Sequence, residues 1–196
     1  MNNEGANTSR RTFLIGATAA IGAVGTVFAA VPFVQSWQPS ARARNAGAPV
    51  KIDIGKLEMG QQVVDEWRGQ PIWVIRRTQR MLDSLPKLDD TLKDPTSSVE
   101  SQQPPYAHNE WRSIKKEYLV LIGICTHLGC SPMYERKPTV ALKYGGFLCP
   151  CHGSKFDFAG RVYKNVPAPT NLVVPPHSYL SDAVIIVGSE EGETKA

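Results

Sequence analysis

Hydrophobic and polar positions divide this chain into two unlike regions. Residues 12–34 form an unbroken run of 23 residues without a charge. Beyond residue 49, short apolar runs rich in β-branched and aromatic residues alternate with polar segments containing proline and glycine, a pattern typical of strands joined by loops. We expect strands at 50–54, 71–75, 117–124, 139–144, 147–148, 160–163 and 183–187. The pattern predicts one long apolar helix followed by a mainly β domain over residues 50–196.

Smaller features complete the expected domain. Short helices are expected at 78–85 and 87–92, on either side of Pro86, followed by a polar, proline-rich loop at 94–109. The tryptophans after residue 50 share no spacing and indicate core or rim packing. We expect surface positions for several further polar residues, since nothing in the sequence pairs them: His108, His177, Arg76, Arg77, Lys115 and Lys116.

The apolar run is long enough to cross a membrane. As a helix it spans about 34 Å at roughly 1.5 Å per residue, against a hydrocarbon core of about 30 Å. A cleaved secretory signal is the alternative; the run exceeds a typical signal core, although Pro32 and the later alanines keep cleavage open. We expect a retained anchor at 12–35.

The residues before the apolar run indicate how the chain is oriented. Ser9-Arg10-Arg11-Thr12-Phe13-Leu14 resembles a twin-arginine export signal, a route that carries folded proteins. We therefore expect residues 1–11 to form a cytoplasmic tail, with the body in the periplasm and the anchor in the bacterial inner membrane.

A short linker follows the anchor. Residues 39–49 contain no large apolar side chain, and we expect 36–49 to act as a flexible hinge. Eleven extended residues reach at most about 36 Å, at roughly 3.3 Å each. A short rigid spacer is the alternative that the sequence leaves open.

Charge excludes one large class of function. The 196 residues carry a net charge of +4, but residues 1–50 hold four arginines against one acidic residue, which leaves 18 basic and 17 acidic residues for the body. A nucleic-acid-binding domain of this size would be expected to carry a basic stripe, and the body shows none. We expect no nucleic-acid partner.

All four cysteines fall in two short segments, each of which also holds a histidine. The segments are Cys-Thr-His-Leu-Gly-Cys at 125–130 and Cys-Pro-Cys-His-Gly-Ser at 149–154. Two thiolates and two imidazoles are a four-ligand set for a borderline or soft metal. A structural zinc site would use four such ligands, but it would give Cys130 and Cys151 no role.

This double motif resembles the Rieske iron–sulfur proteins, and specifically the iron–sulfur subunits of the cytochrome bc1 (quinol–cytochrome c reductase) complex. The resemblance extends to 67–73, 101–106, 159–162 and 167–171, and with the anchor it covers nearly the whole chain. It implies a Rieske-type antiparallel β head with an inserted cluster-binding subdomain at about 118–166. The ligands it implies for one [2Fe–2S] cluster are Cys125, His127, Cys149 and His152, with a disulfide between Cys130 and Cys151.

The same resemblance implies a function. A quinol bound in cytochrome b would give one electron and one proton to the centre through His152, with His127 as the second imidazole. The head would then move and reduce cytochrome c1 within a dimeric, membrane-embedded complex that contributes to the proton gradient. The chain would thus be the catalytic Rieske subunit of a translocating oxidoreductase.

Residues beside the motifs carry further expectations. Ser154 resembles the family serine whose hydroxyl donates to a bridging sulfide and raises the potential; a solvent-facing turn serine is the alternative. Many family members have a Tyr where this chain has Phe156, which suggests a lower midpoint potential here. Residues 167–171 resemble a proline loop that covers the cluster. The segment between His127 and Cys149 is longer than in many family members, and the extra residues around 135–139 suggest a surface hairpin.

Other functions were weighed against this one. A Rieske oxygenase would need a mononuclear iron site in a further domain, for which the chain has no room. The Rieske subunit of another exported oxidase, of the arsenite-oxidase type, would share the export signal and both loops. A zinc-stapled membrane adaptor is the non-redox alternative.

Overall fold

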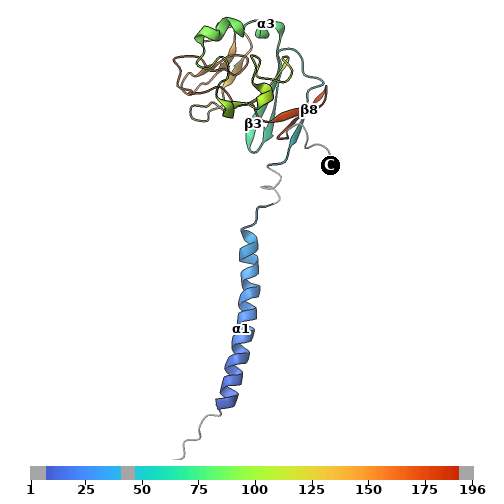
Figure 1. Cartoon of the computed structure of the whole chain (residues 1–196), viewed down its shortest axis with the longest axis vertical. Coiled ribbons are helices and arrows are strands. Elements are labelled where there is room, and N and C mark those ends of the chain that lie inside the picture. The colour runs from blue at the N-terminus through green and yellow to red at the C-terminus, as the bar shows by residue number, and fades with distance from the viewer. Residues whose placement is uncertain (1–7, 41–46, 190–196) are drawn as a thin grey trace, which may run out of the picture. The chain divides into compact units, whose positions relative to one another are not determined.

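The computed structural model describes residues 8–40 and 47–189. The chain divides into two compact units, residues 1–45 and residues 46–196. The first described unit consists of one helix, and the second, which we call the head, is built mainly from strands (Figure 1). The linker residues 41–46 fall outside the described residues, so the hinge expected there stays a prediction.

The anchor is a single helix, α1 (Thr8–Ser36), with Pro32 inside it. It begins before the arginine pair, four residues earlier than the run of uncharged residues, and in length and composition it is suited to crossing a membrane. Its hydroxyl side chains donate back to the helix backbone, as Thr12 Oγ1 does to the Thr8 carbonyl at 2.9 Å and Thr26 Oγ1 to the Gly22 carbonyl at 2.8 Å. Such internal bonds leave few polar groups that need water.

Nine strands and several short helical turns make up the described head. The strands are β1 (Val50–Asp53), β2 (Gln62–Trp67), β3 (Gln70–Arg76), β4 (Tyr118–Ile122), β5 (Met133–Glu135), β6 (Gly146–Leu148), β7 (Lys155–Phe156), β8 (His177–Ser181) and β9 (Val184–Val187). The helical pieces are α3 (Gln79–Leu82) and the 3-10 turns η1 (Pro86–Thr91), η2 (Glu100–Gln102) and η3 (Pro105–Ala107). The strands form three antiparallel sheets in the orders β1-β9-β8, β2-β3-β4 and β5-β6-β7.

The central sheet, β2-β3-β4, is covered on both faces. Alternate residues of β3 belong to different cores: Trp73 and Ile75 pack towards β6 and β7, whereas Ile72 and Val74 pack towards β1 and β9. β4 divides its side chains in the same way. A strand buried on both sides needs apolar residues at every position, which explains the uninterrupted runs in the sequence.

A tight turn sets the register of β2 against β3. Arg68 and Gly69 have φ values of 52° and 72°, and Trp67 pairs with Gln70 across the turn. Two positive φ values in a two-residue loop match the twist of an antiparallel hairpin, and glycine adopts such a value without strain. The turn places β3 at the centre of the sheet, beside β4, from which the first cysteine segment follows.

Several expected elements are confirmed and two are wrong. Strands form in five of the expected regions, namely 50–54, 71–75, 117–124, 147–148 and 183–187. The residues at 139–144 are not a strand but a turn around the buried Leu142, whose N–H is held by Thr139 Oγ1 at 3.1 Å. The residues at 160–163 make only isolated bridges. Side-chain oxygens accept two backbone N–H groups of this stretch, that of Arg161 at Asp157 Oδ1 (2.8 Å) and that of Val162 at Asn171 Oδ1 (2.8 Å), and strand periodicity does not reveal such bonds.

Arg77 is buried, and the surface position expected for it is wrong. Its guanidinium donates to the carbonyls of Lys116 (2.9 Å), Trp111 (2.8 Å) and Phe158 (3.0 Å), and to Ser113 Oγ at 2.7 Å. A charge can be buried when its donors are satisfied in this way. Arg77 therefore ties the end of β3 to two segments distant in sequence.

His177 is also buried, contrary to expectation, whereas His108 is exposed as expected. The His177 ring bonds the Pro175 carbonyl through Nδ1 at 2.8 Å and meets the Tyr106 ring edge-on, with centroids 5.5 Å apart. Its Nε2 has no hydrogen-bond partner within the described residues. Burial lowers the pKa of His177, so the fold favours the neutral ring.

We expect His177→Asn to weaken the dependence of stability on acidity. The folded pKa lies below the unfolded value of 6.5, so only the unfolded state binds the proton between the two, and the free energy of unfolding falls as the pH drops below about 6.5. The limiting slope is about 1.4 kcal/mol per pH unit. Thermal unfolding of the detergent-solubilised chain at pH 5 to 8 measures this, with His108→Asn as the exposed control. Equal slopes for His177→Asn and the parent chain would contradict the assignment.

Candidate metal centre

Two six-residue loops form the centre, and the backbone closes both in the same way. In the first loop, at 125–130, the N–H of Cys125 donates to the Cys130 carbonyl at 2.8 Å and the N–H of Gly129 donates to the Cys125 carbonyl at 3.0 Å. In the second, at 149–154, the N–H of the first residue again reaches the carbonyl of the sixth (2.7 Å), and the N–H of the fifth reaches the carbonyl of the first (3.0 Å). The two loops therefore have the same local construction.

Glycine at the fifth position of each loop allows the backbone conformation that these closing hydrogen bonds require. Gly129 and Gly153 have φ values of 83° and 72°, which side chains other than glycine rarely adopt. A Cβ atom would meet no neighbour within 4 Å at either position, so backbone conformation rather than space selects the glycine.

The sheets fix where each loop begins. The first loop follows β4 after two residues, and the second connects β6 to β7. Both leading cysteines, Cys125 and Cys149, belong to the core that also holds Trp73 and Phe147. Each loop thus starts inside the protein and turns outward.

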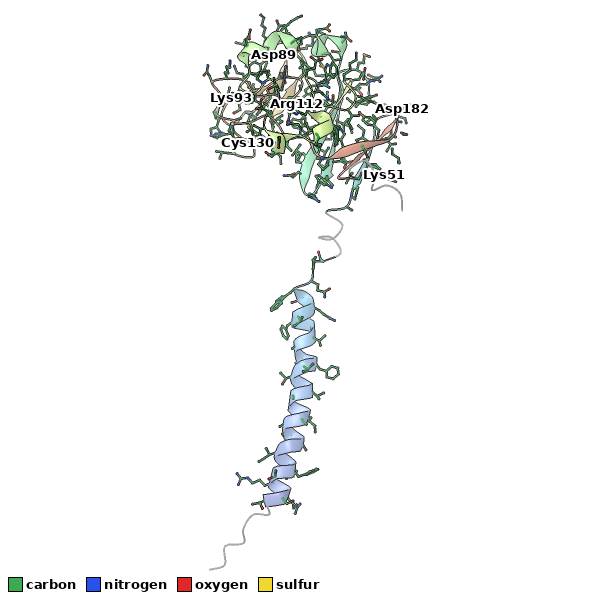
Figure 2. The ribbon with its side chains drawn as sticks, viewed as in Figure 1. Lys51, Asp89, Lys93, Arg112, Cys130 and Asp182 are labelled. Carbon is green, nitrogen blue, oxygen red and sulfur yellow. A yellow bond between two sulfur atoms is a disulfide. The ribbon has the colours of Figure 1, made fainter. Side chains whose placement is uncertain are left out.

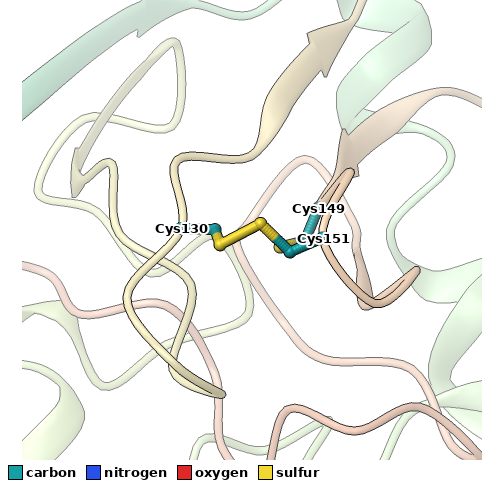
Figure 3. Close-up of side chains that lie close together, drawn as sticks. All are labelled: Cys130, Cys149 and Cys151. Atoms are coloured by element: carbon teal, nitrogen blue, oxygen red, sulfur yellow. A yellow bond between two sulfur atoms is a disulfide. The ribbon is translucent and has the colours of Figure 1, made fainter.

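A disulfide joins the two loops. Cys130 and Cys151 are bonded, with Cα atoms 6.6 Å apart, which confirms the predicted bridge (Figure 3). The Sγ atom of Cys149 lies within 4.8 Å of both bridge sulfurs. Because the bridge cysteines are already bonded to each other, they are not free to act as thiolate ligands, and Cys149 remains the available donor of the three.

The two remaining thiols are buried side by side. Cys125 and Cys149 are free cysteines, each 2% exposed, and their sulfur atoms interact. Burial raises the pKa of the Cys125 thiol, and the neighbouring Cys149 sulfur raises it further, while hydrogen bonds from the His127 backbone and from the Ser154 hydroxyl act in the opposite direction. Two adjacent buried thiols are well placed to share a cation, which would favour their thiolate forms.

The two imidazoles also meet, nearer to solvent. The rings of His127 and His152 have centroids 4.8 Å apart at an interplanar angle of 86°. His127 is half-buried and His152 is exposed, and Leu128, which follows His127 in the chain, is 71% exposed. The structure therefore brings the predicted donors together as a buried sulfur pair and an outer imidazole pair, on loops that are covalently joined.

Ser154 is fully buried, so the solvent-facing alternative is wrong. Its Oγ accepts the N–H of Ala168 at 3.0 Å, which leaves its own proton free to donate to a sulfur of the centre. Ala168 belongs to the proline loop at 167–171, which also receives a hydrogen bond from Thr126 Oγ1 to the Thr170 carbonyl at 2.7 Å. The sequence analysis missed Thr126, although its place between Cys125 and His127 was a signal.

Phe156 lies in the core beside the thiols. It is fully buried in the cluster of apolar side chains that contains Cys125 and Cys149, and it pairs with Phe147 across the β6–β7 ladder. The segment around 135–139 connects the paired strands β5 and β6, as expected of a hairpin.

Removing the bridge should loosen both loops. Cys130→Ser/Cys151→Ser opens a 22-residue covalent loop, and we expect it to cost roughly 3 kcal/mol of unfolding free energy. At roughly 2–4 °C per kcal/mol the midpoint of thermal unfolding should fall by about 10 °C. Reductant should destabilise the parent chain but not the double variant. A double variant that unfolds at the parent temperature would show that the bridge does not hold the loops.

Comparison with known proteins gives consistent matches along the chain. A family model described as "Ubiquitinol-cytochrome C reductase Fe-S subunit TAT signal" matches residues 1–40, and one described as "Rieske [2Fe-2S] domain" matches residues 98–176. The second range contains both loops and the proline loop.

Curated relatives match over nearly their full length. The ubiquinol-cytochrome c reductase iron-sulfur subunit of Allochromatium vinosum is 56% identical, with 98% of this chain and 94% of the relative covered. The subunit of the same name from Bradyrhizobium diazoefficiens is 40% identical, with 92% and 94% covered. Among solved structures, a chain of a "Hyperthermophilic respiratory Complex III" is 25% identical with a TM-score of 0.48, covering 88% of this chain and 98% of that one.

Proposed function

The chain belongs to the family of ubiquinol-cytochrome c reductase iron-sulfur subunits, and on this premise we propose that its head takes single electrons from a quinol and passes them to cytochrome c1. The observation that carries the proposal is the arrangement of the donors, with a pair of buried thiols and a pair of facing imidazoles, of which His152 is exposed, on the same two joined loops. The relatives' shared name favours this function over the arsenite-oxidase type of subunit.

The donor set suits a Rieske [2Fe–2S] cluster, the cofactor of the matched domain. We propose that Cys125 and Cys149 ligate one iron and His127 and His152 the other. When bound, such a cluster stores one electron at about −150 to +300 mV, far above the roughly −400 mV of plant-type clusters with thiolate ligands only. The pairing of thiol with thiol and ring with ring in this structure fits two irons with different ligands.

Two features of the protein govern where the quinol proton goes and keep water from the sulfur atoms. The exposed ring of His152 is placed to accept a hydrogen bond from a quinol hydroxyl, and its outer nitrogen takes the proton as the quinol loses one electron. The half-buried His127 is less accessible to a substrate. Because the thiols are each 2% exposed, the sulfur side of the centre is closed to water.

Location and partners follow from the family and the anchor. We propose that α1 holds the subunit in the bacterial inner membrane, with residues 1–11 in the cytoplasm and the head in the periplasm. The partners proposed are cytochrome b, which binds the quinol, and cytochrome c1, in a dimeric complex. The head would reach both by moving on the linker 36–49, and its cluster-binding part corresponds to residues of about 118–166.

Spectroscopy of membranes tests the cofactor and its ligands. Reduced membranes that hold the full chain should show the EPR signal of a mixed-ligand [2Fe–2S] centre, and His152→Ala should abolish it because one iron loses a ligand. His108→Ala changes an exposed histidine that lies outside both loops, so it should leave the signal unchanged. Zinc in place of iron in the purified chain, or an unchanged signal in His152→Ala, would reject the proposal.

Phe156→Tyr should raise the midpoint potential. The new hydroxyl would lie in the core that holds both thiols and would donate to a sulfur. A hydrogen bond of about 1 kcal/mol corresponds to roughly 40 mV for a one-electron couple. Film voltammetry measures the shift, and Phe158→Tyr, in a separate core cluster, is the matched control. An unchanged midpoint in Phe156→Tyr would contradict the expectation.

Stiffening the linker should slow turnover without changing the centre. Several proline substitutions within 39–49 restrict the backbone there. We expect quinol–cytochrome c reductase activity to fall while the midpoint potential and EPR signal remain those of the parent complex. Full activity in such a variant would count against movement of the head.

A further inference from the structure

We propose that Lys93 is a positioning residue for the centre, acting through the proline loop on the Ser154 hydroxyl and so on the sulfur of the proposed cluster. The inference rests on the proposed cluster but adds a residue that neither loop contains. Lys93 lies in the segment after η1, more than thirty residues before the first cysteine. In Figure 2 it appears on the same side of the head as Cys130, away from Lys51 and Asp182.

Lys93 holds the proline loop at two points. Its ammonium donates to the carbonyl of Val166 at 2.8 Å and to that of Ala168 at 2.7 Å, one on each side of Pro167. The lysine backbone is itself fixed, since its N–H donates to the Val162 carbonyl at 2.9 Å. A single charged group therefore sets the spacing of two carbonyls, and hydrogen bonds to a charged group are the stronger kind.

The part of the loop that Lys93 holds, Pro167-Ala168-Pro169, has only one backbone N–H. Pro167 and Pro169 lack an N–H, so the Ala168 N–H is the only backbone donor of this tripeptide. It donates to Ser154 Oγ at 3.0 Å, and both residues are fully buried. The oxygen of Ser154 is thereby engaged as an acceptor, which leaves the hydroxyl proton free to donate to a sulfur of the proposed cluster.

Asp94, the residue after Lys93, contacts the other end of the proline loop. Asn171 Nδ2 donates to the Asp94 carbonyl at 3.1 Å, and Asn171 Oδ1 accepts the N–H of Val162 at 2.8 Å. The dipeptide Lys93-Asp94 thus contacts both ends of the proline loop. Of these contacts, those of Lys93 lie beside Ala168, whose N–H determines the orientation of the Ser154 hydroxyl.

When a hydroxyl donates a hydrogen bond to a sulfur of an iron–sulfur centre, it withdraws electron density from that sulfur. This favours the reduced form of the centre. If Lys93 is removed, the peptide between Pro167 and Ala168 is less constrained and the Ala168–Ser154 bond is held less firmly. The hydroxyl proton then turns more freely away from the sulfur, and the midpoint potential falls.

The test uses the full chain in its complex and an EPR-monitored redox titration. Lys93→Met should lower the midpoint potential, and Lys93→Arg, which retains a charge and several N–H donors, should restore it at least in part. Lys164→Met is the matched control: Lys164 is an exposed lysine close to the same loop, but it donates to the Asp90 carbonyl at 2.8 Å. Lys164→Met removes the same charge without removing a hydrogen bond to the proline loop. The midpoint potential of this variant should therefore stay near that of the parent.

A double-mutant cycle identifies the route. Combined with Ser154→Ala, Lys93→Met should lower the midpoint no further than Ser154→Ala alone, because the hydroxyl through which it acts is gone. Hydrogen exchange at the Ala168 amide should be faster in Lys93→Met than in Lys164→Met.

Several results would overturn the inference. These are a parent-like midpoint in Lys93→Met, an equal shift in Lys164→Met, or additive shifts in the cycle. If Lys93→Met assembles no centre, Lys93→Gln replaces it in every comparison, and loss of the centre there as well shows a purely structural role. A parent chain without any mixed-ligand signal would instead reject the proposed function, so the two failures are distinguishable.

Discussion

The burial of two adjacent thiols is the constraint on which the rest of the head depends. Cys125 and Cys149 lie in the apolar core under the central sheet, where burial raises the pKa of the Cys125 thiol. With these thiols as the proposed ligands, burial couples the stability of the fold to occupation of the site, because a shared cation would favour the two thiolates in a place that water does not reach. The matching loop closures and the disulfide keep the sulfur pair and the imidazole pair in a fixed relation.

The local parts of the site could be predicted from the sequence because short spacing determines them. Six-residue loops with glycine at the fifth position form their own closing bonds, and the donors follow from residue type. The central strands were also visible, since burial on both faces leaves an unbroken apolar run. Short strands such as β5 and β7 were not, because two or three residues carry no periodic signal.

What the sequence concealed are contacts between residues far apart in the chain. Arg77, His177 and Lys93 each resemble ordinary surface residues in their local context. Their roles depend on partners such as Phe158, Tyr106 and Ala168, which lie 71 to 81 residues away. No local pattern encodes such a partner, and the burial of Arg77 contradicts the usual preference of arginine for the surface.

These distant contacts give the segment between β3 and β4 a role in the centre. It contributes no ligand, yet Lys93 and Asp94 hold the proline loop, and Arg112 donates to the Ala159 carbonyl at 3.1 Å. The ligand loops can therefore keep one local construction while residues outside them adjust the hydrogen bonds that reach the sulfur. Because one charge-assisted bond acts on several residues at once, a change in this segment alters the environment of the cluster without altering its ligands.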